Sequence, residues 1–217
     1  MNERPLRKDA ERNRQRILDA ARELFAARGL GVTLNEIAHH AGVGVGTVYR
    51  RFPDRAQLIE ALLEQRLQEI AGLLKAASED PDPWQALTGF QQRVLELQAE
   101  DRGLKDLLLG APGASERLAK MRGQLRPLAA RLVARAREAG QLRNDCEPED
   151  LGIVQLMLSA VIDAGQDVAP DLWRRYFAIL LRGLRGDDAP PEPLPAPAVS
   201  PSQMDEVLMG AWEQRRA

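Results

Sequence analysis

The chain has 217 residues, of which 44% are hydrophobic, 29% are charged and 4% are aromatic, and its formal net charge at pH 7 is −2. This length and apolar content are enough for one large or two modest hydrophobic cores. No apolar run approaches the roughly 18 residues that a membrane-spanning helix requires, and a single cysteine excludes an internal disulfide. We therefore expect a cytoplasmic protein with no membrane partner.

Strands are hard to find in this sequence, because Val, Ile and Thr are never gathered into alternating runs. Alanine, leucine, arginine, glutamate and glutamine dominate instead, which predicts an all-α fold. The charge is unevenly distributed, since residues 1–66 carry a net charge of +3 and the remainder carries −5. The positive field therefore belongs to the N-terminal end of the chain.

The first predicted helix covers about residues 9–28, where apolar residues recur on one face and a glycine follows as a stop. Residues 1–9 are polar, and we expect them to be disordered in the absence of DNA. Arg12, Arg14 and Arg16 lie at the start of this helix, where they can brace against a phosphate backbone. The alternative for each of them is a solvated charged face.

Two shorter helices follow, joined by a turn that contains glycine. Thr33 and Glu36 have the spacing of a capping box, which marks the start of the first of them. Gly42 breaks the apolar pattern, and a second apolar set then resumes until Pro53 stops it. Two short helices that cross at a glycine turn form a helix-turn-helix, whose second helix enters the major groove of double-stranded DNA.

The outward residues of the second short helix suit contact with DNA. Gly46 lets the backbone approach another surface, and Thr47 carries a methyl and a hydroxyl group. Tyr49, Arg50 and Arg51 can reach phosphates or a guanine edge. The alternative interpretation is an ordinary helical hairpin, in which the tyrosine is half buried and the two arginines are solvated.

A third helix starts after Asp54, which can cap it, and Arg55 lies in its first turn. A cation at this place is unfavourable for the helix dipole, so we expect it to meet an outside anion such as a phosphate. Leucine and isoleucine then recur at helical spacing to about Ala77. Such a connecting helix of about 23 residues is roughly 35 Å long, enough to join two domains.

Residues 33–59 read T-L-x-x-I-A-x-x-A-G-V-x-x-G-T-V-Y-x-x-F-x-D-R-x-x-L-I, which resembles the DNA-binding signature of the tetracycline-repressor (TetR) family. With the preceding helix, the resemblance covers roughly residues 11–70. It implies that the residues in contact with DNA are Thr33, Gly46, Thr47, Tyr49 and Arg55. Gly44 and Val45 stand where the family has serine and lysine, and this departure bears on which operator sequence is read.

The resemblance also implies a domain organisation and a task. We predict a helix-turn-helix head over residues 1–53, a connector helix over 54–77, a ligand-binding and dimerisation domain over 78–186, and a proline-rich linker with a short terminal helix over 187–217. The implied task is transcription regulation by a homodimer, most often as a repressor that a small-molecule effector releases from its operator. An activator, or a DNA-binding protein without a ligand, is the alternative within regulation.

The predicted second domain is a bundle. Apolar periodicity predicts helices over about residues 84–100, 115–139, 149–166 and 171–184, with a short helix around Leu107. The last two are apolar over a wider arc than one core contact requires, which indicates burial in their own domain and against a second copy. The candidate dimer contacts are Leu158, Ile162, Trp173, Phe177 and Leu181. The alternative is that these helices are central in a monomeric bundle.

A bundle with bulky apolar residues can enclose an apolar cavity between its helices. The candidates for its wall are Trp84, Phe90, Leu107, Met121, Leu125 and Met157. Such residues are also ordinary core residues, so the pocket follows chiefly from the resemblance, which implies a small apolar or amphipathic effector.

The C-terminal tail lies outside the resemblance. Residues 187–201 contain six prolines in fifteen positions, which predicts an extended and partly stiff linker. Beyond it, Met204, Val207, Leu208 and Trp212 form a short amphipathic segment. This segment can dock on its own domain, recruit a partner or do neither.

Signatures of enzymatic chemistry are weak. His39 and His40 are adjacent and point away from each other on a helix, and no cysteine or acidic pair joins them at a metal-ligand spacing. Cys146 has no histidine near it in the sequence, so we expect an inert thiol rather than a nucleophile. We therefore predict no catalytic residue, metal or cofactor. The alternative class is a helical small-molecule binding protein or enzyme in which the N-terminal helices are only structural.

Overall fold

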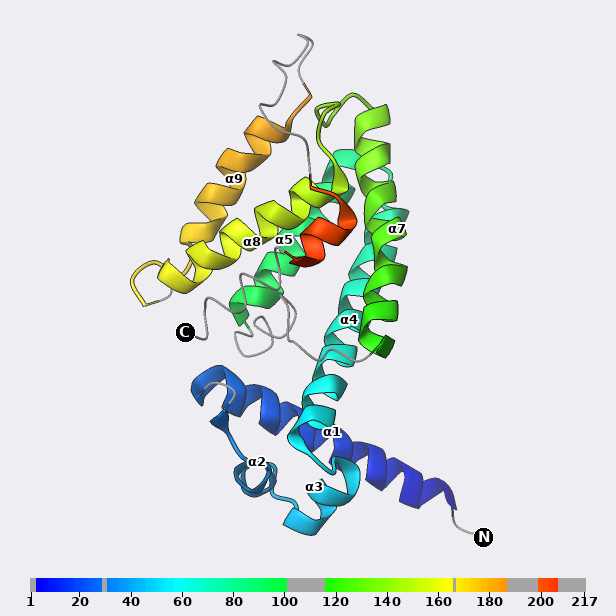
Figure 1. Cartoon of the computed structure of the whole chain (residues 1–217), viewed down its shortest axis with the longest axis vertical. Helices are drawn as coiled ribbons and strands as arrows, with labels where there is room; N and C mark the ends of the chain where they lie inside the picture. Colours follow the sequence, from blue (N-terminus) through cyan, green and yellow to red (C-terminus); the bar gives the residue numbers. More distant parts are fainter. Residues whose placement is uncertain (1–2, 29–30, 101–115, 166, 187–198, 207–217) are drawn as a thin grey trace. The chain divides into compact units, whose positions relative to one another are not determined.

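The computed structural model describes residues 3–28, 31–100, 116–165, 167–186 and 199–206 (Figure 1). Its main helices are α1 (Glu3–Arg28), α2 (Leu34–His40), α3 (Val45–Arg51), α4 (Arg55–Glu79), α5 (Pro83–Glu100), α7 (Glu116–Glu138), α8 (Pro148–Gly165) and α9 (Leu172–Leu184). Over the described ranges the only β-type pairing is an isolated bridge between Leu142 and Arg185. The predicted all-α fold is thus confirmed, while the predicted helix around Leu107 lies outside the described residues. In the same ranges, no helix combines the length and the apolarity that crossing a membrane requires.

The chain divides into two compact units, and the division falls inside α4, between Arg66 and Leu67. The first unit contains α1, α2, α3 and the start of α4. Its core includes Phe25, Ile37, Val48 and Phe52, and all of them are buried. The three short or amphipathic helices therefore share one core, as a helix-turn-helix requires.

The structure corrects the start of the first helix. We predicted a disordered arm over residues 1–9, but α1 already begins at Glu3. Pro5 does not prevent this, because the first turn of a helix has no intrahelical partner for the N–H group that proline lacks. The remaining helix boundaries, which lie in longer periodic segments, fall close to the predicted ones.

The helix α4 has defined ends. At its start the carboxylate of Asp54 accepts a hydrogen bond of 2.8 Å from the backbone N–H of Gln57, so the predicted cap is confirmed. Beyond its end, Arg135 of α7 donates to the carbonyl oxygens of Ser78 and Asp80 at 3.1 and 2.6 Å. A cation at a helix C-terminus satisfies free carbonyl groups and is favoured by the helix dipole.

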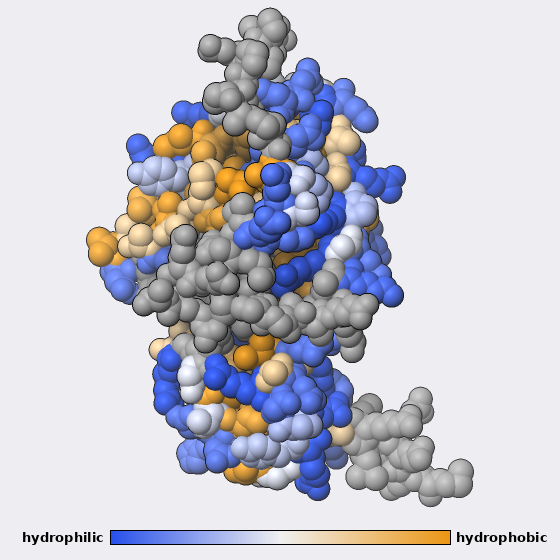
Figure 2. Space-filling view, viewed as in Figure 1, coloured by the Kyte–Doolittle hydropathy of each residue, from blue (hydrophilic) through white to orange (hydrophobic). Residues whose placement is uncertain are grey.

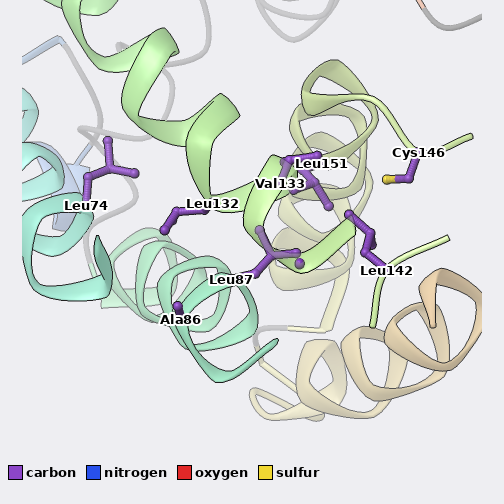
Figure 3. Close-up of a cluster of buried hydrophobic side chains, with 9 residues drawn as sticks. Leu74, Ala86, Leu87, Leu132, Val133, Leu142, Cys146 and Leu151 are labelled. Carbon is purple, nitrogen blue, oxygen red and sulfur yellow. The ribbon is translucent and has the colours of Figure 1, made fainter. Parts of the chain in front are cut away.

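The second unit is held together by two hydrophobic clusters that meet on α5. The first is shown in Figure 3, where side chains from α4, α5, α7, α8 and the loop before α8 converge; it comprises Leu74, Ala86, Leu87, Leu132, Val133, Ala136, Leu142, Cys146 and Leu151. The second joins α5 to α8 and α9, and comprises Leu95, Val154, Leu158, Ile162, Trp173 and Phe177. Both α5 and α8 contribute to the two clusters, and α5 packs against α7 as well as α8, so it fixes the positions of these two helices relative to each other.

Cys146 lies inside the first cluster (Figure 3). Its thiol is buried, and burial raises the pKa of Cys146 from 9.0 to about 12, with the nearby Asp150 carboxylate adding to the effect. Because only the thiolate is a good nucleophile, this cysteine is protonated and unreactive at neutral pH.

Candidate nucleic-acid interface and ligand cavity

The entry into α2 is fixed by a hydrogen-bonded capping box. The Thr33 hydroxyl accepts from the Glu36 N–H at 3.3 Å and donates to the Glu36 carboxylate at 2.8 Å, and the same carboxylate accepts from the Thr33 N–H at 2.9 Å. Arg28, at the end of α1, holds the other carboxylate oxygen at 2.5 Å. These hydrogen bonds, above all those from Thr33, lower the pKa of Glu36 from 4.5 to about 2. The predicted DNA contact Thr33 is thus exposed at a rigid position.

The turn between α2 and α3 depends on Gly42, whose φ of 61° lies in the left-handed region that favours glycine. The Arg16 guanidinium of α1 donates from Nη2 to the carbonyl oxygens of Ala41 at 2.7 Å and Gly42 at 3.3 Å. A Cβ atom at position 42 would lie 3.0 Å from that same Nη2 atom. We predicted Arg16 as a phosphate contact, whereas in the structure it holds the turn that orients α3.

The helix α3 has a buried side and an exposed side. Val48 and the following Phe52 point inward and are buried. Val45 and Tyr49 are each 45% exposed, and Gly46 is also exposed. The exposed side therefore combines apolar, aromatic and backbone surface within two helical turns.

The two arginines of α3 have different surroundings. Arg50 folds along its own helix, where Nε donates to the Gly46 carbonyl at 3.1 Å and Nη2 to the Thr47 hydroxyl at 3.4 Å. Arg51 instead reaches Glu11 of α1, with an N–O distance of 3.4 Å. The structure thus brings Gly46, Thr47 and Arg50 together and ties Arg51 to a different helix.

Arg55 has an unusual environment at the start of α4. Its guanidinium carbon lies 5.9 Å from the centroid of the Phe25 ring, in cation–π distance. Its Nε atom is buried and has no hydrogen-bond partner among the described residues. The side chain as a whole is only half-buried, so its terminal nitrogens are the part that can meet an anion.

The second unit contains a mainly apolar cavity of about 220 Å³. Its wall comes from α4, α5, α7 and α8, and comprises Ile70, Leu87, Phe90, Gln91, Val94, Ala129, Val133, Pro148, Leu151, Gly152 and Gln155. Among the residues that the structure describes, no charged side chain is part of this wall. Transfer of a charged ligand into such a site would lose its hydration without compensation, so the cavity suits a neutral molecule.

Of the predicted pocket residues that the structure describes, only Phe90 is part of this wall. Trp84 and Leu125 pack on the first hydrophobic cluster, Met121 is half-buried elsewhere on α7, and Leu107 lies outside the described residues. Met157 is exposed, because it is two positions from Gln155 and a helix turns about 200° over two residues.

Gln91 and Gln155 form the polar part of the cavity wall, and Gln98 extends their hydrogen-bonded chain outside the wall. The Gln155 amide nitrogen donates to the Gln91 carbonyl at 2.9 Å and also contacts the Gln91 side-chain oxygen. Gln98 donates to the Gln155 side-chain oxygen at 3.2 Å, while its own Oε1 is buried without a partner among the described residues. Sequence analysis missed these residues, although a readable signal existed: Gln91 and Gln98 interrupt the apolar stripe of α5.

Most of the predicted dimer residues are buried in the core of the second unit. Leu158, Ile162, Trp173 and Phe177 belong to the second cluster, and the rings of the last two are 6.5 Å apart. Leu181 packs against that cluster and is half-buried. The apolar residues that α8 and α9 expose are Met157 (46%), Tyr176 (45%) and Ile179 (49%), and hydrophobic surface is visible over these two helices in Figure 2. Apolar periodicity selects a core face and a contact face alike, so it could not separate these two sets.

The capping box generates a prediction about pH. Because the pKa of Glu36 is lowered from 4.5 to about 2, its carboxylate stabilises the folded protein above pH 4.5, and this stabilisation is lost as the pH falls towards 2. In thermal unfolding followed by circular dichroism, Glu36→Gln should melt at a lower temperature than the wild type at pH 7, with a difference that shrinks at acid pH.

Glu138→Gln is the matched control, because it removes an exposed carboxylate at the end of α7. A difference between Glu36→Gln and the wild type that stays constant from pH 7 to pH 2 would contradict this role for Glu36.

Known proteins share both units of the chain. A family model described as bacterial regulatory proteins of the tetR family matches residues 17–62, and one described as the C-terminal domain of SbtR-like transcriptional regulators matches residues 82–186. A solved TetR transcription regulatory protein from Mycobacterium vanbaalenii is 34% identical, with a TM-score of 0.61, covering 83% of this chain and 99% of that one. SmeT, the repressor of the Stenotrophomonas maltophilia multidrug efflux pump SmeDEF, is 25% identical, with a TM-score of 0.59 and coverages of 84% and 97%.

Curated relatives match over a shorter region. An HTH-type transcriptional regulator of Staphylococcus aureus is 37% identical over 76 residues, which is 35% of this chain and 41% of that protein. The chain thus matches less than half of the length of this relative. Both family models and these relatives are transcriptional regulators rather than enzymes. The chain belongs to the TetR family of bacterial regulatory proteins.

Proposed function

We propose that this protein is a sequence-specific DNA-binding repressor that acts as a homodimer in the cytoplasm and leaves its operator when a small neutral ligand fills the cavity. The observation that carries the proposal is that α3 has one exposed side, while its opposite side is buried and fixes the helix in place. Val45, Tyr49 and Arg50 are exposed there, while Val48 is fully buried. A helix in this arrangement can enter a major groove without unfolding its own core.

The side chains of α3 suggest how DNA is read. Val45 is an exposed apolar residue that suits contact with a thymine methyl group, and Arg50 can exchange its bonds to Gly46 and Thr47 for a guanine edge. Thr33, Tyr49 and Arg55 are assigned to the phosphates and to positioning. The lack of a side-chain cap at Gly44 leaves N–H groups at the start of α3, which also favour a phosphate.

We expect Tyr49→Ala and Arg50→Ala each to weaken operator binding by about tenfold, because each removes a contact from the exposed side of α3. Arg55→Ala should weaken binding to any sequence and reduce the slope of log affinity against log salt by about one. The measurement is fluorescence anisotropy with the DNA that flanks the protein's own gene, against scrambled DNA at the same salt.

Arg131→Ala is the matched control, because it removes an exposed arginine from α7 instead of α3. It should leave operator affinity unchanged. If Arg131→Ala weakens binding as much as Arg50→Ala, a sequence-reading role for α3 is ruled out. The same role is ruled out if the wild type binds flanking and scrambled DNA equally and a random-sequence selection also yields no preferred sequence.

A homodimer is supported by the apolar residues that α8 and α9 expose, which are Met157, Tyr176 and Ile179. Large apolar side chains at a surface gain free energy when a second copy covers them. Two α3 helices would then read successive major grooves, about 34 Å apart, and their binding free energies would add. This assignment moves the dimer contacts from the buried residues of the second cluster to the exposed residues beside them.

Ile179→Glu should shift the protein towards monomer and weaken operator binding, because a charge would be buried at the interface. Leu128→Glu, on α7, changes another exposed apolar residue (41%) and should leave the dimer intact. Sedimentation equilibrium measures the mass in both cases. A dimer of unchanged stability in Ile179→Glu would place the interface elsewhere.

Release by a ligand is supported by the cavity and by the helix that borders it. Ile70 of α4 lines the cavity, and Leu58 of the same helix is buried in the core of the first unit. A ligand that displaces Ile70 therefore acts on the helix that begins beside α3. The ligand shifts the equilibrium only if it binds the DNA-incompetent arrangement better than the competent one.

The ligand class follows from the wall: a neutral, largely apolar molecule with a hydroxyl or similar group that meets the glutamines. We expect 2-naphthol to bind and to lower operator affinity. Gln155→Leu should weaken 2-naphthol binding by about fivefold through the loss of one hydrogen bond, as measured by titration calorimetry.

Binding of naphthalene, which lacks the hydroxyl group, should not be weakened by Gln155→Leu. Gln92→Leu is the control, because it replaces an exposed glutamine on α5, one of the helices of the cavity wall. Equal losses in Gln92→Leu and Gln155→Leu would mean that the amide network does not contact the ligand.

A further inference from the structure

The C-terminal tail contains a short helix whose start is marked by local sequence signals. Ser200 and Gln203 form a reciprocal capping box: the Gln203 N–H donates to the Ser200 hydroxyl at 3.3 Å, and the Ser200 N–H donates to the Gln203 side chain at 2.8 Å. Pro201 occupies the first helical position, where its fixed φ favours the helix. Residues 201–206 are therefore helical through local signals as well as through docking.

This segment is seated on the second unit by one apolar and one ionic contact. Met204 is only 9% exposed, and a Cβ atom at Gly152 would lie 2.8 Å from its Cε. Asp205 accepts from Arg126 of α7 at 2.6 Å, and the same guanidinium donates to the Pro201 carbonyl at 3.4 Å. The segment thus contacts α7 and α8 at once, and Figure 1 shows it beside both helices.

Gly152 lies directly under the end of the Met204 side chain. Glycine inside a helix is unfavourable relative to alanine, and here the missing side chain makes room for Met204. A second observation points the same way: Arg122 of α7 has its Nε and Nη2 atoms buried without a hydrogen-bond partner among the described residues. Asp205 interacts favourably with that charge.

The location of these contacts relates the segment to the cavity. Gly152, the seat of Met204, is itself part of the cavity wall. Ala129, one helical turn from Arg126, is part of the same wall. The helix α7 packs chiefly against α5, and α8 packs against α9 and α5, while α7 and α8 make little contact with each other. The segment therefore ties together two helices of the cavity wall that pack only weakly on each other, although none of its own residues is part of that wall.

We infer that residues 200–206 form a strap that holds α7 and α8, two walls of the ligand cavity, together and must detach for these helices to part and let a ligand enter or leave. The inference rests on the proposed ligand-binding function. Among the described residues, the strap is held by the flexible Met204, by the hydrogen bond from Arg126 to the Pro201 carbonyl, and by an ion pair whose side chains are 47% and 57% exposed. An exposed ion pair is weak, so the strap can open without unfolding of the bundle.

The test measures the rates of 2-naphthol binding to the full chain by stopped-flow fluorescence. Met204→Ala should increase both the association and the dissociation rate constants by about tenfold, because the apolar contact that holds the strap is lost. Asp205→Asn should increase both rates by a smaller factor. Glu206→Gln is the matched control, because it removes an exposed carboxylate one position away and should leave both rates unchanged.

Hydrogen exchange of the α8 amides around Gly152 gives a second readout that needs no ligand. It should become faster in Met204→Ala and remain unchanged in Glu206→Gln. Binding of 2-naphthol with the same rates in all four proteins would overturn the strap and leave the ligand cavity in place. Absence of 2-naphthol binding in every protein would instead overturn the ligand-binding function, and the strap would then control no ligand entry.

Discussion

A helix of seven residues has no independent stability in water, so the work of α3 depends on how its inner side is held. Val48 and Phe52 fix that side in the core of the first unit, while Gly42 and Arg16 fix the turn that precedes it. The outer side does not contribute to this core and can contact another molecule. Tyr49 can remain exposed because nothing in the fold requires its burial, and this division of one short helix into a packed side and a free side is what makes DNA contact possible.

In the second unit the arrangement is reversed, because polar side chains lie in the interior. Gln91 and Gln98 are buried and Gln155 is half-buried, so each amide needs a partner to offset the hydration that it loses. They bond to one another across α5 and α8, yet the Oε1 atom of Gln98 has no partner among the described residues. Such a network is well suited to a ligand that adds a hydrogen bond, and unsuited to one that brings a net charge.

The sequence predicted the parts of this protein that local chemistry determines. The capping box of Thr33, the turn at Gly42 and the helix start at Asp54 each depend on neighbours within a few residues, and the structure contains all three. The cavity wall contains few of the predicted pocket residues, because it depends on the rotation of α8, which puts Gln155 in the wall and Met157 outside. The inner and outer apolar residues of α8 and α9 look alike in sequence for the same reason, since periodicity identifies a face but not what covers it.

A strap that holds two walls of a cavity together need not change the affinity of the ligand. If it docks equally well when the cavity is empty and when it is filled, it slows entry and departure by the same factor, and the dissociation constant is unaltered. Affinity changes only if the ligand reaches the strap's own seat. Because Gly152 belongs both to the cavity wall and to the seat of Met204, a ligand that fills the cavity as far as α8 must disturb the docked strap. A smaller ligand would have its residence time set by the strap without being selected by it, whereas a larger one would be selected by size as well.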